Sequence, residues 1–224
     1  MIYIVGPQRE EIEDIVKKIN IEKEIQYLNY TLYIGKLNNK DVILSCGGIG
    51  KVGISVIVTY VLSHYSISRV INVGTCGGLN DAETYDIICG DKLFYLDADV
   101  TTFGYEYGQM AKCPRYFKCD EEGINVFKEY ANTVGDMISG DSFFTKNNIL
   151  ASKLDEFKQF NLKTVDMETT SVAQVCYIFG VKFNALRIVS DNINSKEQKA
   201  SYEEVLKYSS SKISDILFRT ITVL

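Results

Sequence analysis

The sequence predicts a single α/β domain of three layers, with helices on both sides of a central β-sheet. Short β-prone runs alternate with apolar runs at helical spacing along the whole chain. A length of 224 residues with 46% hydrophobic residues is enough to bury one substantial core. No repeat, linker or low-complexity segment interrupts this alternation, so we expect one domain over residues 1–224.

The N-terminal part of the chain predicts a strand, a helix and a hairpin. Residues 1–5 are apolar and β-prone and predict the first strand. The helix after them is indicated by apolar residues at helical spacing, which are Ile12, Ile15, Val16 and Ile19. Residues 30–37 and 42–46 predict two strands that a turn at Asn38 and Asn39 joins into a hairpin.

The middle of the chain predicts one helix and several strands. Residues 52–62 follow the segment GGIGK and predict a buried helix. Residues 69–73 predict a strand that enters a glycine-rich turn, GTCGG. Three further strands are expected, at residues 87–95, 134–139 and 181–189.

Two more helices complete the predicted order. One runs from Glu168 to Phe179 and ends at Gly180, which is typical of a C-terminal cap. Its buried face is predicted from the helical spacing of four residues, Val172, Val175, Cys176 and Phe179. The last helix is expected over residues 202–220.

Composition and charge exclude several classes of function. The net charge is -5, and no stripe of Lys and Arg is present, so we expect no nucleic-acid partner. The longest apolar stretch, residues 54–62, is too short to span a bilayer, so we expect no membrane partner. The start MIYIVGPQ has no basic leader region, which favours the cytoplasm. The six cysteines are then expected to be free thiols rather than disulfides or zinc ligands.

The glycine-rich segments and the single histidine carry little chemistry by themselves. Neither GGIGK nor GTCGG has the spacing of a P-loop or of GxGxxG. Glycine there permits either close approach of backbone amides to a ligand or tight packing of a strand on a helix, and both interpretations stay open. His64 is the only histidine and ends an apolar helix, which argues against a Ser-His-Asp triad and a His-based zinc site.

Two acidic residues are placed where strands are expected to end. Glu168 follows the run VDM, and Asp191 follows RIVS. Open α/β sheets bind ligands beyond the carboxyl ends of their strands, so both side chains can point into one pocket. Two carboxylates there can divide the work of breaking a bond, one holding the substrate and one supplying a proton. Each could instead be an acid at the start of a helix, stabilised by the helix dipole.

Seven segments in order resemble the nucleoside phosphorylase/hydrolase superfamily, and most closely its 5′-methylthioadenosine/S-adenosylhomocysteine nucleosidases. The resemblance covers nearly the whole chain. Its segments are Gly6 with Glu11, GGIGKV at 47–52, NVGTCGGL at 72–79, DADVTTFGYEYGQ at 97–109, SGDSFF at 139–144, VDMET at 165–169 and RIVSDN at 187–192. The run DADVTTFGYEYGQ is the most discriminating of them.

The resemblance implies a nucleoside phosphorylase-like fold, with a central mixed β-sheet flanked by helices. It also implies hydrolysis of the N-ribosidic bond of methylthioadenosine, S-adenosylhomocysteine and 5′-deoxyadenosine to release adenine. Water is the second reactant, and neither a cofactor nor a metal ion is implied.

The resemblance also assigns roles around the scissile bond. Glu168 resembles the residue that accepts hydrogen bonds from the ribose hydroxyls. Asp191 resembles the acid that delivers a proton toward purine N7, with help from Ser190. Glu11 resembles the general base that orients the attacking water, and Thr75 would hold that water or a ribose oxygen.

Further positions are expected to bind or support the substrate. Arg187 would fix the acidic segment at 166–168, and Met167 would pack under the ribose. Phe143 resembles the aromatic residue that stacks on adenine, and the backbone of Phe144 would read the edge of the base. The same resemblance adds three pocket residues, Cys76, Gly77 and Asp166.

An apolar wall is expected around the 5′-thio substituent. The residues that resemble it are Ile49, Phe103, Tyr105 and Tyr202. In this family Phe103 and Tyr105 would come from a second subunit, so the resemblance implies a homodimer. Gln8 and Asp166 depart from the family pattern and leave the substrate preference open.

Three other functions compete with hydrolysis of thionucleosides. A phosphorylase needs cations for phosphate, and Asn72 and Val73 stand before GTCGG where an arginine is usual, although Arg9 lies near the first loop. A hydrolase of futalosine or adenylate needs a site for a polar tail. A nucleoside-binding protein would not need Glu11, Glu168 and Asp191 together.

Overall fold

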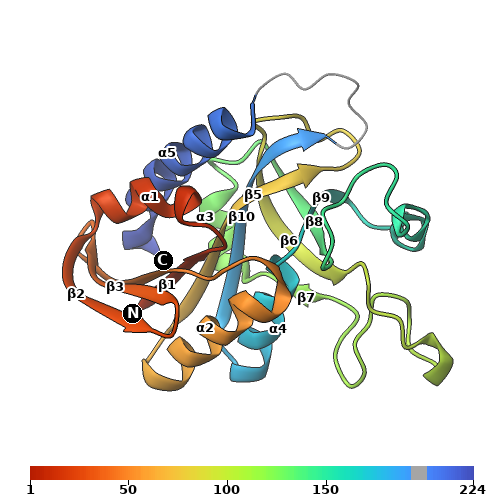
Figure 1. Ribbon diagram of the computed structural model, residues 1–224, viewed down its shortest axis with the longest axis horizontal. Helices are drawn as coiled ribbons and strands as arrows, with labels where there is room; N and C mark the ends of the chain where they lie inside the picture. Colours follow the sequence, from red (N-terminus) through yellow and green to blue (C-terminus); the bar gives the residue numbers. More distant parts are fainter. Residues whose placement is uncertain (193–200) are drawn as a thin grey trace.

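The computed structural model describes residues 1–192 and 201–224 (Figure 1). The chain alternates between strands and helices. In chain order the elements are β1 (Ile2–Gly6), α1 (Arg9–Lys18), β2 (Asn20–Tyr27), β3 (Tyr30–Leu37), β4 (Lys40–Cys46), α2 (Gly50–His64), β5 (Arg69–Gly78), β6 (Ile87–Tyr95), η1 (Thr101–Phe103), β7 (Phe117–Lys118), α3 (Glu121–Phe127), β8 (Thr133–Ser139), η2 (Ala151–Phe157), β9 (Leu162–Asp166), α4 (Thr169–Phe179), β10 (Lys182–Asn192), α5 (Tyr202–Thr220) and η3 (Ile221–Val223).

The strands form one mixed sheet, as the resemblance implied. Its order is β10-β6-β8-β9-β5-β1-β4-β3-β2. Strand β10 also pairs with β5, in parallel, so that β5, β9, β8, β6 and β10 close into a ring. Strands β1, β4, β3 and β2 extend from β5 as an open sheet that ends in the antiparallel hairpins β3–β4 and β2–β3, and the short strand β7 pairs with β6. The expected α/β fold with a central mixed sheet is confirmed.

Helices cover the sheet from two sides. In Figure 1, α1 and α5 lie together on one side, whereas α2 and α4 lie on the other. Each pair has its own apolar core. Ile57 and Val172 belong to the core under α2 and α4, while Ile12 and Ile213 belong to the core under α1 and α5. Both cores are made of side chains removed from water, which is the main contribution to the stability of the layers.

The glycine-rich segment GTCGG is part of a strand, so the predicted turn was wrong. Strand β5 continues to Gly78, because β10 pairs with it along this whole length and β9 pairs with Gly77 and Gly78. Gly74 has a φ of +149°, and a Cβ there would lie 2.3 Å from Nη1 of Arg187. The glycine is therefore needed to make room for a buried guanidinium rather than to turn the chain.

Among the described residues, the sequence did not predict six elements, and it misplaced one side chain. The missed elements are β2, β7, α3 and the three 3₁₀ helices η1, η2 and η3, whereas for β9 only its end before Glu168 was expected. The eight-residue strand β2 is exposed over most of its length and lacks the apolar alternation that identifies a strand. Phe179, expected on the buried face of α4, is 40% exposed at the end of that helix.

The structure also shows how helix α4 ends and where the cysteines lie. Gly180 takes the left-handed conformation after α4, with a φ of 68°, as expected of a C-terminal cap. All six cysteines are free, and four of them are buried. Within residues 1–192 and 201–224, the helices are too short or too polar to span a bilayer.

Candidate active site

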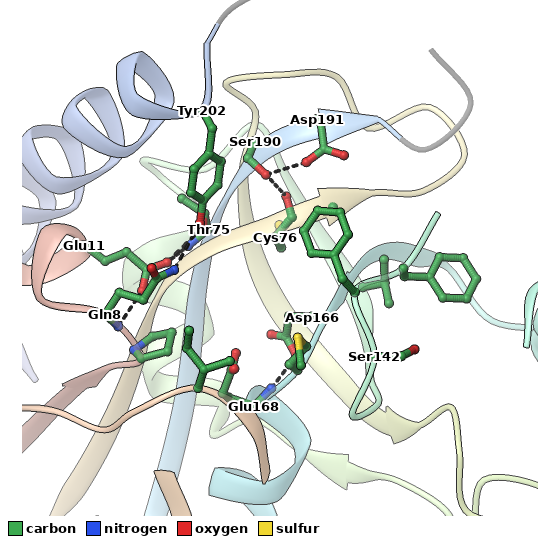
Figure 2. Close-up of a pocket in the computed structure, with 17 residues that line it drawn as sticks. Gln8, Glu11, Thr75, Cys76, Ser142, Asp166, Glu168, Ser190, Asp191 and Tyr202 are labelled. Atoms are coloured by element: carbon green, nitrogen blue, oxygen red, sulfur yellow. Dashed lines mark hydrogen bonds between the residues drawn. The ribbon is translucent and has the colours of Figure 1, made fainter. Parts of the chain in front are cut away.

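A cavity of about 310 Å³ opens at the carboxyl ends of the strands (Figure 2). All but three of the predicted site residues line it. Its walls come from the loops after β1, β4, β8 and β9, from the ends of β5, β9 and β10, and from the first turns of α1 and α5. The lining residues are Pro7, Gln8, Glu11, Ile49, Thr75, Cys76, Gly77, Ser142, Phe143, Phe144, Val165, Asp166, Met167, Glu168, Ser190, Asp191 and Tyr202.

Glu168 lies on the floor of the cavity, directly before helix α4. Its side chain is 5% exposed, and its Oε1 accepts a hydrogen bond of 2.8 Å from the backbone N–H of Gly50. Burial raises the pKa of Glu168 to about 7, an effect that Asp166 increases and Arg187 opposes. This carboxyl therefore changes charge near neutral pH.

Asp166 holds the loop that carries Glu168. Its Oδ1 accepts hydrogen bonds from the backbone N–H groups of Glu168 and Thr169, at 3.2 and 3.1 Å. Ser139 donates to the same oxygen at 2.5 Å. Oδ2 accepts from the Thr169 hydroxyl and forms an ion pair with Arg187 Nε at 3.1 Å. The cavity floor is thus fixed by one fully engaged carboxylate.

Arg187 lies behind the cavity and does not line it, so it does not bind the substrate directly; through its ion pair with Asp166 it contacts the acidic segment that it was expected to fix. The side chain is fully buried. Besides Asp166, its guanidinium bonds Asn72 Oδ1 at 2.6 Å, the Val73 carbonyl at 3.2 Å and the Thr169 hydroxyl. A guanidinium with this many acceptors stays charged and can order the chain around it.

Glu11 projects from α1 into the opposite side of the cavity. It is 1% exposed, and its Oε1 accepts hydrogen bonds from the backbone N–H and the hydroxyl of Thr75, at 2.7 and 2.9 Å. Oε2 accepts from the backbone N–H of Gln8 at 2.9 Å. Burial raises the pKa of Glu11, against the effects of Arg187 and of the Thr75 bonds. A carboxylate with a raised pKa is a better base than one in water.

Asp191 lies near the end of β10, where the strand is irregular. The register between β10 and β5 shifts between Val189 and Asp191, which leaves Ser190 unpaired. Such a bulge redirects the side chains next to it. The Ser190 hydroxyl lies 2.7 Å from Asp191 Oδ1 and 3.1 Å from the Cys76 carbonyl, and Figure 2 shows this group above the cavity.

Apolar and aromatic side chains complete the walls. Phe143 is 73% exposed and Ile49 is 61% exposed, whereas Phe144 is buried. Tyr202 accepts a hydrogen bond of 3.0 Å from Gln8 Nε2, which links the start of α5 to the loop before α1. Gln8, which departs from the family pattern, therefore contacts Tyr202 at the rim of the cavity.

Two predicted wall residues lie away from this cavity. Phe103 belongs to η1 and is 79% exposed, and neither it nor Tyr105 lines the cavity of its own chain. Conversely, the predicted set lacked Pro7, Gln8, Ser142 and Val165. Their positions inside GPQ, SGDSFF and VDMET, next to predicted residues, were the available signal.

The arrangement brings three carboxyl groups of different surroundings to one cavity. Glu11 and Glu168 are nearly excluded from water, while Asp191 is half-buried and bonded to a hydroxyl. Carboxyl groups whose environments differ in this way can serve as acid and base in one reaction. Among the described residues, no group of His, Cys, Asp and Glu is arranged to hold a metal ion.

Comparison with known proteins identifies the family. The phosphorylase superfamily matches residues 1–222. The 5′-methylthioadenosine/S-adenosylhomocysteine nucleosidase of Staphylococcus epidermidis is 36% identical in an alignment over 213 residues that covers 92% of each chain. The chain belongs to this nucleosidase family of the phosphorylase superfamily.

Solved structures agree with this assignment. The family member from Neisseria meningitidis, in complex with methylthio-immucillin-A, has a TM-score of 0.89 and 28% identity over 100% of this chain and 99% of that one. The family member from Colwellia psychrerythraea, in complex with adenine, has a TM-score of 0.90 and 26% identity over 100% of this chain and 95% of that one.

The raised pKa of Glu168 predicts a pH-dependent stability. The folded protein holds this proton up to about pH 7, whereas the unfolded chain loses it near ~4.3. Between these values the folded state binds more protons, so the free energy of unfolding falls as the pH rises and is flat above the folded pKa. We expect Glu168→Gln to reduce this fall by roughly 3–4 kcal/mol, as measured by urea unfolding at several pH values.

The matched control is Glu22→Gln, on the exposed strand β2. Its free energy of unfolding should decrease with rising pH by the same amount as that of the wild-type protein. An unchanged pH dependence in Glu168→Gln would show that the buried carboxyl does not take up the proton.

Proposed function

We propose that this protein hydrolyses the N-ribosidic bond of 5′-methylthioadenosine, S-adenosylhomocysteine and 5′-deoxyadenosine, and so releases adenine. The observation that carries the proposal is the convergence of Glu11, Glu168 and Asp191 on one cavity, with Thr75 bonded to Glu11. The name of the family supports the first two of these substrates, and its adenine-bound member supports adenine as the product.

Glu168 is assigned to the ribose. Breaking the N-ribosidic bond leaves positive charge on the sugar, so a carboxylate close to the ribose stabilises the transition state more than the substrate. Ribose hydroxyls donate well to an ionised carboxylate, and the Gly50 N–H already orients one oxygen of Glu168. Met167 would pack beneath the sugar ring, next to Glu168 along the chain.

Asp191 is assigned to the leaving base. Adenine leaves as an anion unless N7 receives a proton, so an acid at this position lowers the barrier. The Ser190 hydroxyl orients the carboxyl through its 2.7 Å contact with Oδ1. Phe143 would stack on the purine, and the backbone of Phe144 would bond its edge.

Glu11 is assigned to the attacking water. Its Oε1 and the Thr75 hydroxyl lie 2.9 Å apart, so one water molecule can contact both groups from the cavity. Burial raises the pKa of Glu11, which strengthens it as a base. The same side chain is held on both oxygens by backbone N–H groups, so it keeps one orientation as the water reacts.

Phosphorolysis is disfavoured by the charges around the cavity. Among the described residues, those that line it include no Lys or Arg. Arg9, the cation that keeps this alternative open in the sequence, bonds the Tyr33 hydroxyl at 2.5 Å and stacks on its ring. A phosphate co-substrate would therefore lack the cations it needs. The same shortage disfavours futalosine or adenylate, whose tails are anionic.

The active species is proposed to be a homodimer, with one catalytic domain over residues 1–224 in each subunit. Phe103 is exposed and lies outside its own cavity, so it is available to the cavity of a second copy. Apolar side chains exposed to this extent favour association. The free cysteines fit a cytoplasmic location, where thiols stay reduced.

The first test of the function is the identity of the product. Methylthioadenosine in phosphate-free buffer should give adenine and methylthioribose, and added phosphate should not change the rate, because water is the nucleophile. Chromatography with mass detection distinguishes methylthioribose, the product of hydrolysis, from the sugar 1-phosphate that phosphorolysis would give. A sugar 1-phosphate, or strict dependence on phosphate, would overturn the proposal.

The second test removes the acid. Asp191→Asn keeps the shape and the contact with Ser190 but cannot deliver a proton, so we expect kcat to fall by ~10²–10⁴-fold with KM within a few-fold. Steady-state kinetics on methylthioadenosine measures both. Asp41→Asn, an exposed hairpin residue, is the control and should match the wild type. A near-normal kcat in Asp191→Asn would remove Asp191 from this role.

The third test concerns the second subunit. If Tyr105 of a neighbour covers the 5′ substituent, Tyr105→Ala should raise KM for S-adenosylhomocysteine by roughly tenfold, since burying an aromatic side chain is worth one to a few kcal/mol. The KM for 5′-deoxyadenosine, which lacks the long substituent, should change little. Sedimentation velocity should show a dimer for the wild type. An active monomer, or equal losses on both substrates, contradicts this assembly.

A further inference from the structure

The N-terminus of helix α2 has no cap of its own and is capped by other segments. Ile49 occupies the cap position, and its side chain offers no hydrogen bond. The first free N–H, of Gly50, donates to Glu168 Oε1 at 2.8 Å. The next, of Lys51, donates to Asp141 Oδ1 at 2.9 Å. Two carboxylates thus satisfy the positive end of this helix.

The ammonium group of Lys51 joins one of these carboxylates, that of Asp141, to a third segment. It lies 2.8 Å from both oxygens of Asp97 and 3.5 Å from Asp141 Oδ2. The backbone N–H of Asp141 also donates to Asp97 Oδ2 at 2.8 Å. The three residues therefore connect the start of α2 with the segments that follow β6 and β8.

This three-residue network adjoins the cavity without lining it. Ile49 precedes the network on α2, and Ser142 and Phe143 follow Asp141 along the chain, and all three line the cavity. Figure 2 shows Ser142 and Glu168, which the network joins, on separate parts of the wall. A displacement of Lys51 would move the wall and the Gly50 N–H together.

We propose that Lys51, Asp97 and Asp141 are positioning residues of the nucleosidase reaction, which hold the Gly50 N–H on Glu168 and the Ile49 and Phe143 walls around the nucleoside. This inference rests on the proposed function, because it assigns Glu168 to the ribose. Nothing in the resemblance gives these three residues a role.

The network differs from an ordinary surface ion pair. Exposed pairs contribute little, since water screens them. Here the side chains of Lys51 and Asp97 are only 24% and 21% exposed, whereas that of Asp141 is 48% exposed, and the ammonium lies 5.3 Å from the centre of the Tyr95 ring. The Lys51 ammonium contacts two carboxylates, those of Asp97 and Asp141, which also accept hydrogen bonds from backbone N–H groups. These interactions stabilise the same arrangement of the three residues.

The network should also affect the titration of Glu168. The groups that face this carboxyl are Asp166 on β9, Arg187 on β10, Glu11 on α1 and the Gly50 N–H on α2. The Gly50 bond favours the ionised form and lowers the pKa of Glu168 against the larger effect of burial. Release of the Gly50 N–H would therefore move ionisation of Glu168 to higher pH.

The experiment compares Lys51→Met with Lys36→Met by steady-state kinetics of the full-length protein between about pH 5 and about pH 9, a range that spans the usual pKa of a perturbed carboxyl. Lys36 pairs with Asp41 in the β3–β4 hairpin, away from the cavity, so it is a matched control. We expect Lys51→Met to raise KM roughly three- to tenfold. The acidic limb of its kcat/KM profile should move up by about half a pH unit.

Asp97→Asn keeps the shape of its side chain. It should raise KM and shift the acidic limb of the kcat/KM profile in the same directions as Lys51→Met, but by less. Lys51→Arg keeps the positive charge, so its KM and its pH profile should be close to those of the wild type. The melting temperature of each variant shows whether a change in kinetics is accompanied by a loss of stability. If Lys51→Met and Asp97→Asn lose stability but keep the KM and pH profile of the wild type, the network is only structural and the proposal fails. A wild-type protein without nucleosidase activity would instead refute the proposed function.

Discussion

The buried guanidinium of Arg187 is the constraint on which the site depends. A charge removed from water must be paired and fully hydrogen-bonded, and loss of a partner typically costs ~3–5 kcal/mol. Arg187 meets this demand with Asp166, Asn72, the Val73 carbonyl and the Thr169 hydroxyl. These partners belong to β5, β9 and the start of α4, so one side chain on β10 sets the relative positions of the elements that carry Glu168 and Thr75.

The closed ring of strands makes that arrangement possible. Because β10 pairs with β5 over nearly its whole length, Arg187 lies opposite Gly74, where the lack of a Cβ leaves room for the guanidinium. The same pairing brings Asp191 opposite Gly77 after the irregularity at Ser190. The ring therefore supplies a rigid base beneath the cavity, while the reactive groups stand on strand ends and short loops above it. Preorganised charges of this kind need little rearrangement when the transition state forms.

The sequence predicted the elements whose apolar side chains form a clear pattern. Strands β3 and β6 and helix α5 have the expected bounds, since each combines a clear apolar pattern with recognisable ends. Strand β2 could not be predicted, because it is exposed and is defined by its pairing with β3 alone. GTCGG was misread because glycines occur in turns and at close contacts alike, and only the position of Arg187 distinguishes the two. The family resemblance predicted most of the cavity residues. It did not predict the contact of Lys51 with Asp97 and Asp141, because these residues lie in segments far apart in the sequence and no local pattern relates them.

The central claim is that Glu11, Glu168 and Asp191 act on one nucleoside at the same time. The most direct test is a crystal structure of the Asp191→Asn protein with intact methylthioadenosine. The account predicts ribose hydroxyls on Glu168, purine N7 within hydrogen-bonding distance of residue 191, and a water molecule held by Glu11 and Thr75 beneath the anomeric carbon. A nucleoside bound with its ribose away from Glu168, or with N7 directed away from residue 191, would contradict it.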